Sequence, residues 1–244
     1  MSEDVGSDGH TDKSGADPVA EARSRILAAA LPHVPFDGWS DACLKVAAQD
    51  AGVDPHVAKL AFPRGGVDMA IAHHRAGDAE MAARLKEMDF DGLRVRDRII
   101  FAVRTRIEIA ARHRDAVRRA AALFALPTHA ATGARLIWET ADHIWTVLGD
   151  PSEDLNWYSK RAILSGVYSA TLLYWLGDES PGNSDTWAFL DRRIDGVMRF
   201  EKFKAKVKEN PLGRMMMRGP DWLASRIRKP GGPVDTGTPV DLPG

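Results

Sequence analysis

The sequence predicts an all-helical protein, and three observations lead to this fold class. Apolar residues recur every three or four positions through most of the chain, which is the period of an amphipathic α-helix. The alternation of period two that marks a β-strand is hard to find. The chain has 244 residues, of which 44% are hydrophobic and 27% are charged, so it is long enough to bury a sizeable core.

The two clearest predicted helices lie in the second half of the chain, at about 157–176 and about 128–148. Each carries a broad apolar stripe at helical spacing. Between them, the run Gly149-Asp150-Pro151-Ser152 is typical of a turn that joins antiparallel neighbours. Three further helices are predicted at about 96–113, 115–125 and 185–208.

The first half breaks into shorter helices because Pro and Gly interrupt the helical pattern. They are predicted near 18–31, 41–51, 55–61 and 66–84. Within them, Gly52 supplies a left-handed turn residue, Val53 fills the hinge and Asp54 caps the next helix, which indicates a helix-turn-helix. The arrangement resembles the N-terminal domain of TetR-type repressors, in which Phe follows the turn glycine by ten residues, as Phe62 does here.

The second helix of this motif lacks the side chains that read DNA. A recognition helix needs hydrogen-bond donors that reach base edges and cations that meet phosphates. In the helix at 55–61 only His56 and Lys59 are polar, and Gly65-Gly66 stands where such repressors commonly have a lysine. We therefore expect a packing scaffold with no nucleic acid as partner. A TetR-type ligand-responsive transcriptional regulator is the alternative.

The most distinctive stretch runs from Gly149 to Arg161 and contains the adjacent aromatic residues Trp157 and Tyr158. Neighbouring helix positions diverge by about 100°, so both rings cannot face the core. Acidic residues precede the pair and Lys160 follows it, a composition that suits a protein-binding hot spot. The alternative is that Trp157 packs inward and Tyr158 covers the end of the bundle.

This stretch and the residues after it are similar to the Coq-nine family. The likeness continues through Val167-Tyr168-Ser169-Ala170-Thr171, Trp175, Asp178, Ser180, Thr186-Trp187 and Phe189-Leu190. It covers roughly residues 20–206, and no family pattern is recognised after about Lys208. The resemblance implies a lipid-binding accessory protein of ubiquinone biosynthesis, with a TetR-like helical bundle that does not bind DNA.

The resemblance also implies what the protein binds. Family members are homodimers that hold isoprenoid lipid between helices and present quinone intermediates to the demethoxyubiquinone hydroxylase. The hydroxylase-facing residues map onto Asp154, Trp157, Tyr158 and Arg161. We expect a pocket for an isoprenoid quinone precursor or a phospholipid among the helices at 96–113, 128–148 and 157–176. Its expected residues are Ile137, Ala141, Trp145, Val167, Tyr168 and Thr171.

The sequence contains no pattern typical of a catalytic centre. Glu139 precedes His143 by four residues rather than the three of a di-iron Glu-x-x-His pair. A His-Glu-x-x-His zinc pattern, a Gly-x-Ser-x-Gly nucleophile motif and a Gly-rich nucleotide loop are also absent from the sequence. We therefore expect a protein that is not an enzyme and carries no metal or cofactor beyond a bound lipid.

Charge is distributed unevenly along a chain whose formal net charge is −1. Residues 1–17 carry a net charge of −4 and residues 199–229 a net charge of +7. At 209–229, cations alternate with apolar bulk, which suits a segment that lies on a membrane surface; folding back over the bundle is the alternative. The expected membrane contacts are Met215, Met216, Trp222, Leu223, Arg226 and Ile227. The tails at 1–17 and 230–244 are expected to be disordered.

The predicted domains are a helix-turn-helix-like subdomain at 18–85 and a larger lipid-binding helical domain at 93–208. Cys43 is the only cysteine, which favours a reducing compartment. The N-terminus resembles neither a secretory signal nor the leader of mitochondrial members, and no apolar stretch approaches the roughly 18 residues of a membrane span. We therefore expect a bacterial cytoplasmic protein that associates peripherally with the inner membrane.

Overall fold

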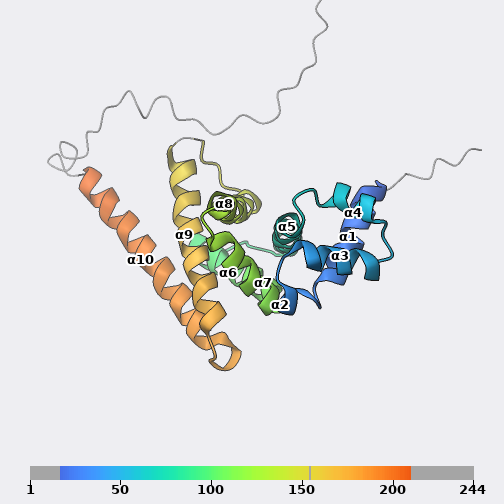
Figure 1. Ribbon diagram of the computed structural model, residues 1–244. Coiled ribbons are helices and arrows are strands. Elements are labelled where there is room, and N and C mark those ends of the chain that lie inside the picture. Colours follow the sequence, from blue (N-terminus) through green and yellow to red (C-terminus); the bar gives the residue numbers. More distant parts are fainter. Residues whose placement is uncertain (1–16, 154, 210–244) are drawn as a thin grey trace, which may run out of the picture. The chain divides into compact units, whose positions relative to one another are not determined.

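The computed structural model describes residues 17–153 and 155–209, and every regular element within them is helical (Figure 1). The elements are α1 (Pro18–Ala30), α2 (Val34–Asp37), α3 (Asp41–Asp50), α4 (Pro55–Ala61), α5 (Gly66–Lys86), α6 (Val95–Ala111), α7 (Arg114–Ala125), α8 (Ala130–Val147), α9 (Leu155–Gly177), the 3-10 helix η1 (Pro181–Asn183) and α10 (Ser184–Glu209). Each helix that apolar periodicity predicts is present, with ends that differ by at most two residues. The four-residue α2 was missed because Pro35, which a first helical turn tolerates, was interpreted as a break.

Helices begin where local sequence signals place them. The side chains of Asp17, Ser40 and Asp54 each accept a hydrogen bond from a backbone N–H in the first turn of α1, α3 and α4. These N-caps satisfy donors that have no partner inside the helix. Between α3 and α4, Gly52 has a φ of 61°, which confirms the left-handed turn residue of the predicted helix-turn-helix.

The described chain divides into two compact units. Unit 1 comprises the residues up to Glu80 together with Glu108–Leu136, and unit 2 comprises Met81–Ile107 together with the residues from Ile137 onward. The predicted division into 18–85 and 93–208 follows chain order, whereas this grouping places residues 108–136 with the helix-turn-helix. Within unit 1, Trp39 Nε1 donates a hydrogen bond to the carbonyl oxygen of Ala116 at 2.9 Å. Periodicity along one segment carries no information about a contact between residues so far apart in the chain.

In unit 1, α1 packs against both α3 and α4, and α2 packs against α7. Phe62, the residue ten positions after Gly52, is fully buried in the core of this unit. Val53 packs against the same core from the hinge, as its apolar side chain predicts. The other fully buried core side chains include Ile26, Val34, Cys43 and Met69. The motif is thus held together by its own hydrophobic core.

In unit 2, α9 and α10 form a helical hairpin (Figure 1). The connection is closed by Asp178, whose carboxylate accepts hydrogen bonds from the backbone N–H of Ser180 at 2.8 Å and of Thr186 at 3.0 Å, and from the Thr186 hydroxyl at 2.5 Å. Hydrogen bonds from Ser180 and then Thr186 hold the pKa of Asp178 well below its ordinary value. The buried side chains of the two helices include Leu164, Tyr168, Trp175, Leu190 and Ile194. A single carboxylate therefore ties the connection after α9 to the first turn of α10.

Candidate functional site

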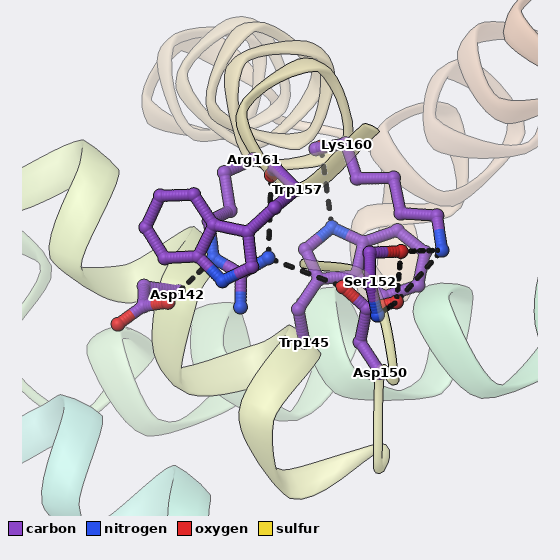
Figure 2. A network of polar contacts seen from close by, with 7 residues as sticks. All are labelled: Asp142, Trp145, Asp150, Ser152, Trp157, Lys160 and Arg161. Carbon is purple, nitrogen blue, oxygen red and sulfur yellow. Dashed lines mark hydrogen bonds and ion pairs between the residues drawn. The ribbon is translucent and has the colours of Figure 1, made fainter. Parts of the chain in front are cut away.

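The turn between α8 and α9 is organised by the carboxylate of Asp150 (Figure 2). The side chain of Asp150 is only 1% exposed. Its Oδ1 accepts hydrogen bonds from Lys160 Nζ at 2.7 Å and from Ser152 Oγ at 2.8 Å, and its Oδ2 accepts one from Arg161 Nη1 at 3.1 Å. Two cations and a hydroxyl thus offset the cost of burying this charge.

Arg161 lies between two carboxylates beneath the start of α9. Its Nε donates to Asp142 Oδ1 on α8 at 2.5 Å, and its Nη1 donates both to Asp150 and, at 3.3 Å, to the carbonyl oxygen of Trp157. The Arg161 side chain is 3% exposed, whereas that of Asp142 is 40% exposed. The guanidinium therefore joins α8, the turn and α9 from the interior side.

The electrostatics of the turn favour the ionised form of Asp150. Burial disfavours the charge, but hydrogen bonds from Lys160, Ser152 and Arg161 outweigh this effect and lower the pKa of Asp150 below its ordinary value of 3.8. Asp150 is consequently ionised at neutral pH, and its negative charge stabilises the folded turn.

Above this network lies an aromatic cluster formed by Trp138, Trp157 and Tyr158. The rings of Trp157 and Tyr158 meet edge to face with centroids 4.8 Å apart, and Trp138 lies 6.0 Å from the first and 6.4 Å from the second. All three residues are partly exposed. Trp157 and Tyr158 therefore share one partly buried cluster, although they are neighbours in the helix. Trp138 was missed by the sequence prediction because it lies on the preceding helix.

The Trp157 ring stacks on the guanidinium of Arg161, with Cζ 3.9 Å from the ring centroid. The resemblance had placed Arg161 among the surface residues that face a partner. Its burial contradicts a large direct contact area for this side chain. Asp154, the fourth residue of that prediction, lies outside the described residues.

Trp145, a predicted lipid contact, is part of the same turn network (Figure 2). Its Nε1 donates to the carbonyl oxygen of Lys160 at 3.2 Å, and the Lys160 ammonium lies 5.2 Å from its ring centroid. The hydrogen bond and the cation–π contact together fix the position of the indole beside Lys160.

The other predicted pocket residues form the interior of unit 2. Ala141 and Thr171 are fully buried, Tyr168 is 1% exposed and Val167 is 6% exposed, whereas Ile137 is partly exposed. Thr171 satisfies its hydroxyl by donating to the carbonyl oxygen of Val167 at 2.7 Å. Apolar periodicity identified these residues correctly as inward-facing. It could not distinguish a packed core from a ligand pocket, so the lipid contacts of these residues stay a prediction.

A groove of about 510 Å³ lies elsewhere in unit 2, between α9 and α10. It is lined by Ile163, Gly166, Val167, Ala170, Arg192, Arg193, Gly196 and Val197. Of the predicted pocket residues named above, only Val167 reaches it. The sequence does contain a signal for this groove, namely Gly166 and Gly196 inside the two helices. A glycine in the interior of a helix usually has a packing or functional reason.

The remaining sequence predictions concern the membrane-contact segment, the two tails, metal sites and membrane-spanning helices. Met215, Met216, Trp222, Leu223, Arg226 and Ile227 lie outside the described residues, as do both predicted disordered tails apart from Asp17. Within residues 17–153 and 155–209, no group of three or more His, Cys, Asp or Glu side chains is arranged to hold a metal ion. In the same part of the chain, no helix combines the length and apolar character that crossing a bilayer requires.

The predicted recognition helix α4 presents few groups suited to DNA. His56 and Lys59 are exposed. The apolar Leu60, which follows Lys59, is also exposed, at 68%. Gly66, which stands where TetR-type repressors commonly have a lysine, lies against the backbone of Trp39. A Cβ atom on Gly66 would stand 2.2 Å from the Trp39 carbonyl oxygen. This glycine is therefore explained by close packing within unit 1.

Comparison with known proteins places the aromatic cluster inside a recognised family segment. The COQ9 family model matches residues 130–201, which run from the start of α8 into α10. A ubiquinone biosynthesis protein COQ9 of Drosophila melanogaster is 33% identical over 199 residues, covering 80% of this chain and 61% of that protein. The protein of the same name in Rattus norvegicus is 30% identical over 222 residues, covering 86% of this chain and 70% of that protein. The chain thus spans about two thirds of the length of these relatives.

A solved structure shares the fold. The crystal structure of a TetR transcriptional regulator from Nitrosomonas europaea superposes with a TM-score of 0.59 at 19% sequence identity, covering 72% of this chain and 97% of that one. At this identity the likeness concerns the fold alone. The all-α, TetR-like fold class predicted from the sequence is confirmed.

The predicted location is overturned by the same relatives. The matching proteins of Drosophila melanogaster, Rattus norvegicus and Homo sapiens are all named as mitochondrial, and their organisms are eukaryotes. This contradicts the expectation of a bacterial cytoplasmic protein, which rested on the acidic N-terminus. With relatives of this identity and coverage, and with its TetR-like fold, the chain belongs to the COQ9 family.

Proposed function

We propose that this protein acts in ubiquinone biosynthesis as an accessory that binds isoprenoid quinone intermediates and presents them to the demethoxyubiquinone hydroxylase. The names of its relatives support the pathway, because they are ubiquinone biosynthesis proteins. The resemblance that identified the family supports the lipid, the hydroxylase and a homodimeric state. The protein itself would supply binding and presentation, and the hydroxylase would supply the chemistry.

The observation that carries this proposal is the partly exposed cluster of Trp138, Trp157 and Tyr158. Large aromatic side chains at a surface, ringed by charged groups, are typical of the residues that dominate the energy of protein–protein interfaces. The cluster lies within the segment that the family model matches. We therefore assign it as the surface that docks the hydroxylase.

The groove between α9 and α10 supports the lipid part of the proposal. Its volume of about 510 Å³ is within the range of small-molecule sites, and Ile163, Val167 and Val197 give it an apolar lining. Arg192 and Arg193 add cations at the same groove. Such a site suits an isoprenoid chain or a phospholipid acyl chain, with the polar end of the ligand near the arginines.

Binding to the hydroxylase is tested by surface plasmon resonance with purified partners. Trp157→Ala should weaken binding by about thirtyfold or more, because truncating a central aromatic anchor costs 2 kcal/mol or more. Tyr174→Ala is a matched control, because Tyr174 is another partly exposed aromatic residue of α9, at the opposite end of the helix from the cluster. It should change the affinity less than twofold. Equal losses for both variants would contradict the assignment of the docking surface.

Lipid binding is tested by extracting the purified protein and analysing the extract by mass spectrometry. Isoprenoid or phospholipid should copurify with the natural sequence. Gly196→Leu places a side chain in the groove and should lower the copurified lipid severalfold. Gly177→Leu adds the same side chain at an exposed position and should leave it unchanged. Absence of any lipid from the natural sequence would overturn the carrier role.

A further inference from the structure

We propose that Arg161 is a positioning residue that holds Trp157 in its docking conformation and does not itself contact the partner. The inference rests on the proposed function, since it concerns the same docking surface. It replaces the surface role that family resemblance implied for Arg161 with one that the contacts of this side chain define.

The first support is where the guanidinium directs its hydrogen bonds. Nε and Nη1 point to Asp142 on α8, to Asp150 in the turn and to the carbonyl oxygen of Trp157 on α9 (Figure 2). With a side chain 3% exposed, Arg161 has little surface to offer a partner. Its charge is neutralised by two carboxylates from α8 and from the turn.

The second support is the position of the Trp157 ring. One ring face lies on the guanidinium, with Cζ 3.9 Å from the centroid. The Tyr158 ring meets the Trp157 ring in a T-shaped arrangement with centroids 4.8 Å apart, and the Trp138 ring is tilted against it at 6.0 Å. Arginine stacks on aromatic faces because its charge is delocalised over a plane. The indole is therefore restrained by three neighbouring groups before any partner arrives. Such preorganisation lowers the entropy lost on binding and so strengthens it.

The third support is the way Asp150 fixes Arg161 in turn. Asp150 is as deeply buried as Arg161 and is held from its other side by Lys160 and Ser152. A planar guanidinium that bridges two carboxylates has one defined orientation. The chain of contacts from the turn through Arg161 to Trp157 thus sets the direction of the aromatic ring.

A double-mutant cycle separates positioning from direct contact. Arg161→Met should weaken hydroxylase binding about tenfold, the combined effect expected of a lost cation–π contact and a newly mobile ring. In a Trp157→Ala background the same change should have less than a twofold effect, because Arg161 then has no ring to position. If the two substitutions instead weaken binding independently, Arg161 touches the partner and the inference is wrong.

A spectroscopic measurement tests the same inference without the partner. Trp157 in a fixed environment contributes to the near-ultraviolet circular dichroism spectrum, which is measured by difference from Trp157→Ala. Arg161→Met should abolish this contribution while the far-ultraviolet spectrum stays helical. Arg161→Lys keeps the charge but loses the plane, so it should fold and still lose most of the signal. A full Trp157 signal in Arg161→Lys would overturn the positioning role.

The two measurements also separate this inference from the proposed function. Failure of the natural sequence to bind the hydroxylase would refute the docking proposal, whereas the spectra would still report whether Arg161 orders Trp157. Binding by the natural sequence, with additive losses in the cycle, would retain the docking surface and refute only the positioning role.

Discussion

The guanidinium carbon of Arg161 lies 3.9 Å from the ring centroid of Trp157, and Nη1 of the same side chain lies 3.1 Å from the carboxylate of Asp150. This relationship joins a buried ion pair to a partly exposed aromatic cluster. The stability of the α8–α9 turn and the geometry of the surface above it therefore depend on one side chain.

Substitution of Asp150 should destabilise the protein strongly. Asp150→Asn leaves Arg161 without its buried anion, and breaking a buried pair in this way costs about 3 kcal/mol. Equilibrium unfolding in urea, followed by circular dichroism, measures the loss. Asp195→Asn is the control, because Asp195 is half exposed in its ion pair with Arg96, so solvent screens the pair and the loss should be much smaller than for Asp150→Asn. Similar losses at the two positions would contradict the structural role of Asp150.

The contribution of Asp150 should also depend on pH in a defined direction. Its pKa is lowered in the folded protein, so the unfolded chain takes up a proton first as the pH falls. The stabilisation that the charge of Asp150 provides is fully present at pH values well above 3.8, the ordinary pKa of the group. It is lost as the pH falls below 3.8 and passes the lower pKa of Asp150 in the folded protein. The unfolding free energies of the natural sequence and of Asp150→Asn should therefore converge below that pH. A difference that stays constant down to complete protonation would exclude an electrostatic origin.

Gly66→Ala should destabilise unit 1 because the added Cβ would stand 2.2 Å from a backbone oxygen of Trp39. Overpacking of this kind costs typically about 1–3 kcal/mol, and a backbone neighbour cannot move aside as a flexible side chain can. Thermal unfolding measures the effect. Gly166→Ala is the matched control, because its Cβ would meet open space inside α9 and should stabilise the helix by about 0.5–1 kcal/mol. A neutral Gly66→Ala would refute the close approach.

Cys43 should resist alkylation in the folded protein. Burial, and then the nearby charge of Asp37, raises the pKa of its thiol from 9.0 to about 11, and the thiolate is the reactive form. At pH 8, iodoacetamide should modify Cys43 slowly in buffer and rapidly in urea, as followed by intact-mass spectrometry. A control with Cys43→Ser and Ser184→Cys places a thiol at an exposed position and should react rapidly in both conditions. Fast labelling of the folded natural sequence would contradict the buried position.

The helix-turn-helix should bind no specific DNA sequence. α4 offers an exposed Leu60 among few polar groups, so base readout has no adequate set of donors. An electrophoretic shift with DNA from upstream of its own gene, at about 150 mM salt, tests this expectation, since weak phosphate contacts are screened there. A shift that survives excess competitor DNA would favour the transcriptional-regulator alternative.

Local sequence signals accounted for the helices and the helix-turn-helix. Apolar spacing marks one face of each helix, and Asp54 and Gly52 define helix starts and turns through interactions with their immediate neighbours. These are short-range effects, so a single sequence is sufficient to predict them. The family likeness was also visible in the sequence, because it lies in the contiguous run around Trp157 and Tyr158.

Only the tertiary structure decided what the inward-facing and charged residues do. Helical spacing placed Tyr168 and Thr171 inside the bundle, but whether an interior is packed or hollow depends on the neighbouring helices. Likewise, Arg161 beside an aromatic pair suits a surface as well as a core until Asp142 and Asp150 are brought to it from α8 and the turn. The stretch around Trp157 thus determined the family by itself. The fold determined that its arginine lies beneath the ring, because only the folded chain brings two distant carboxylates to one buried cation.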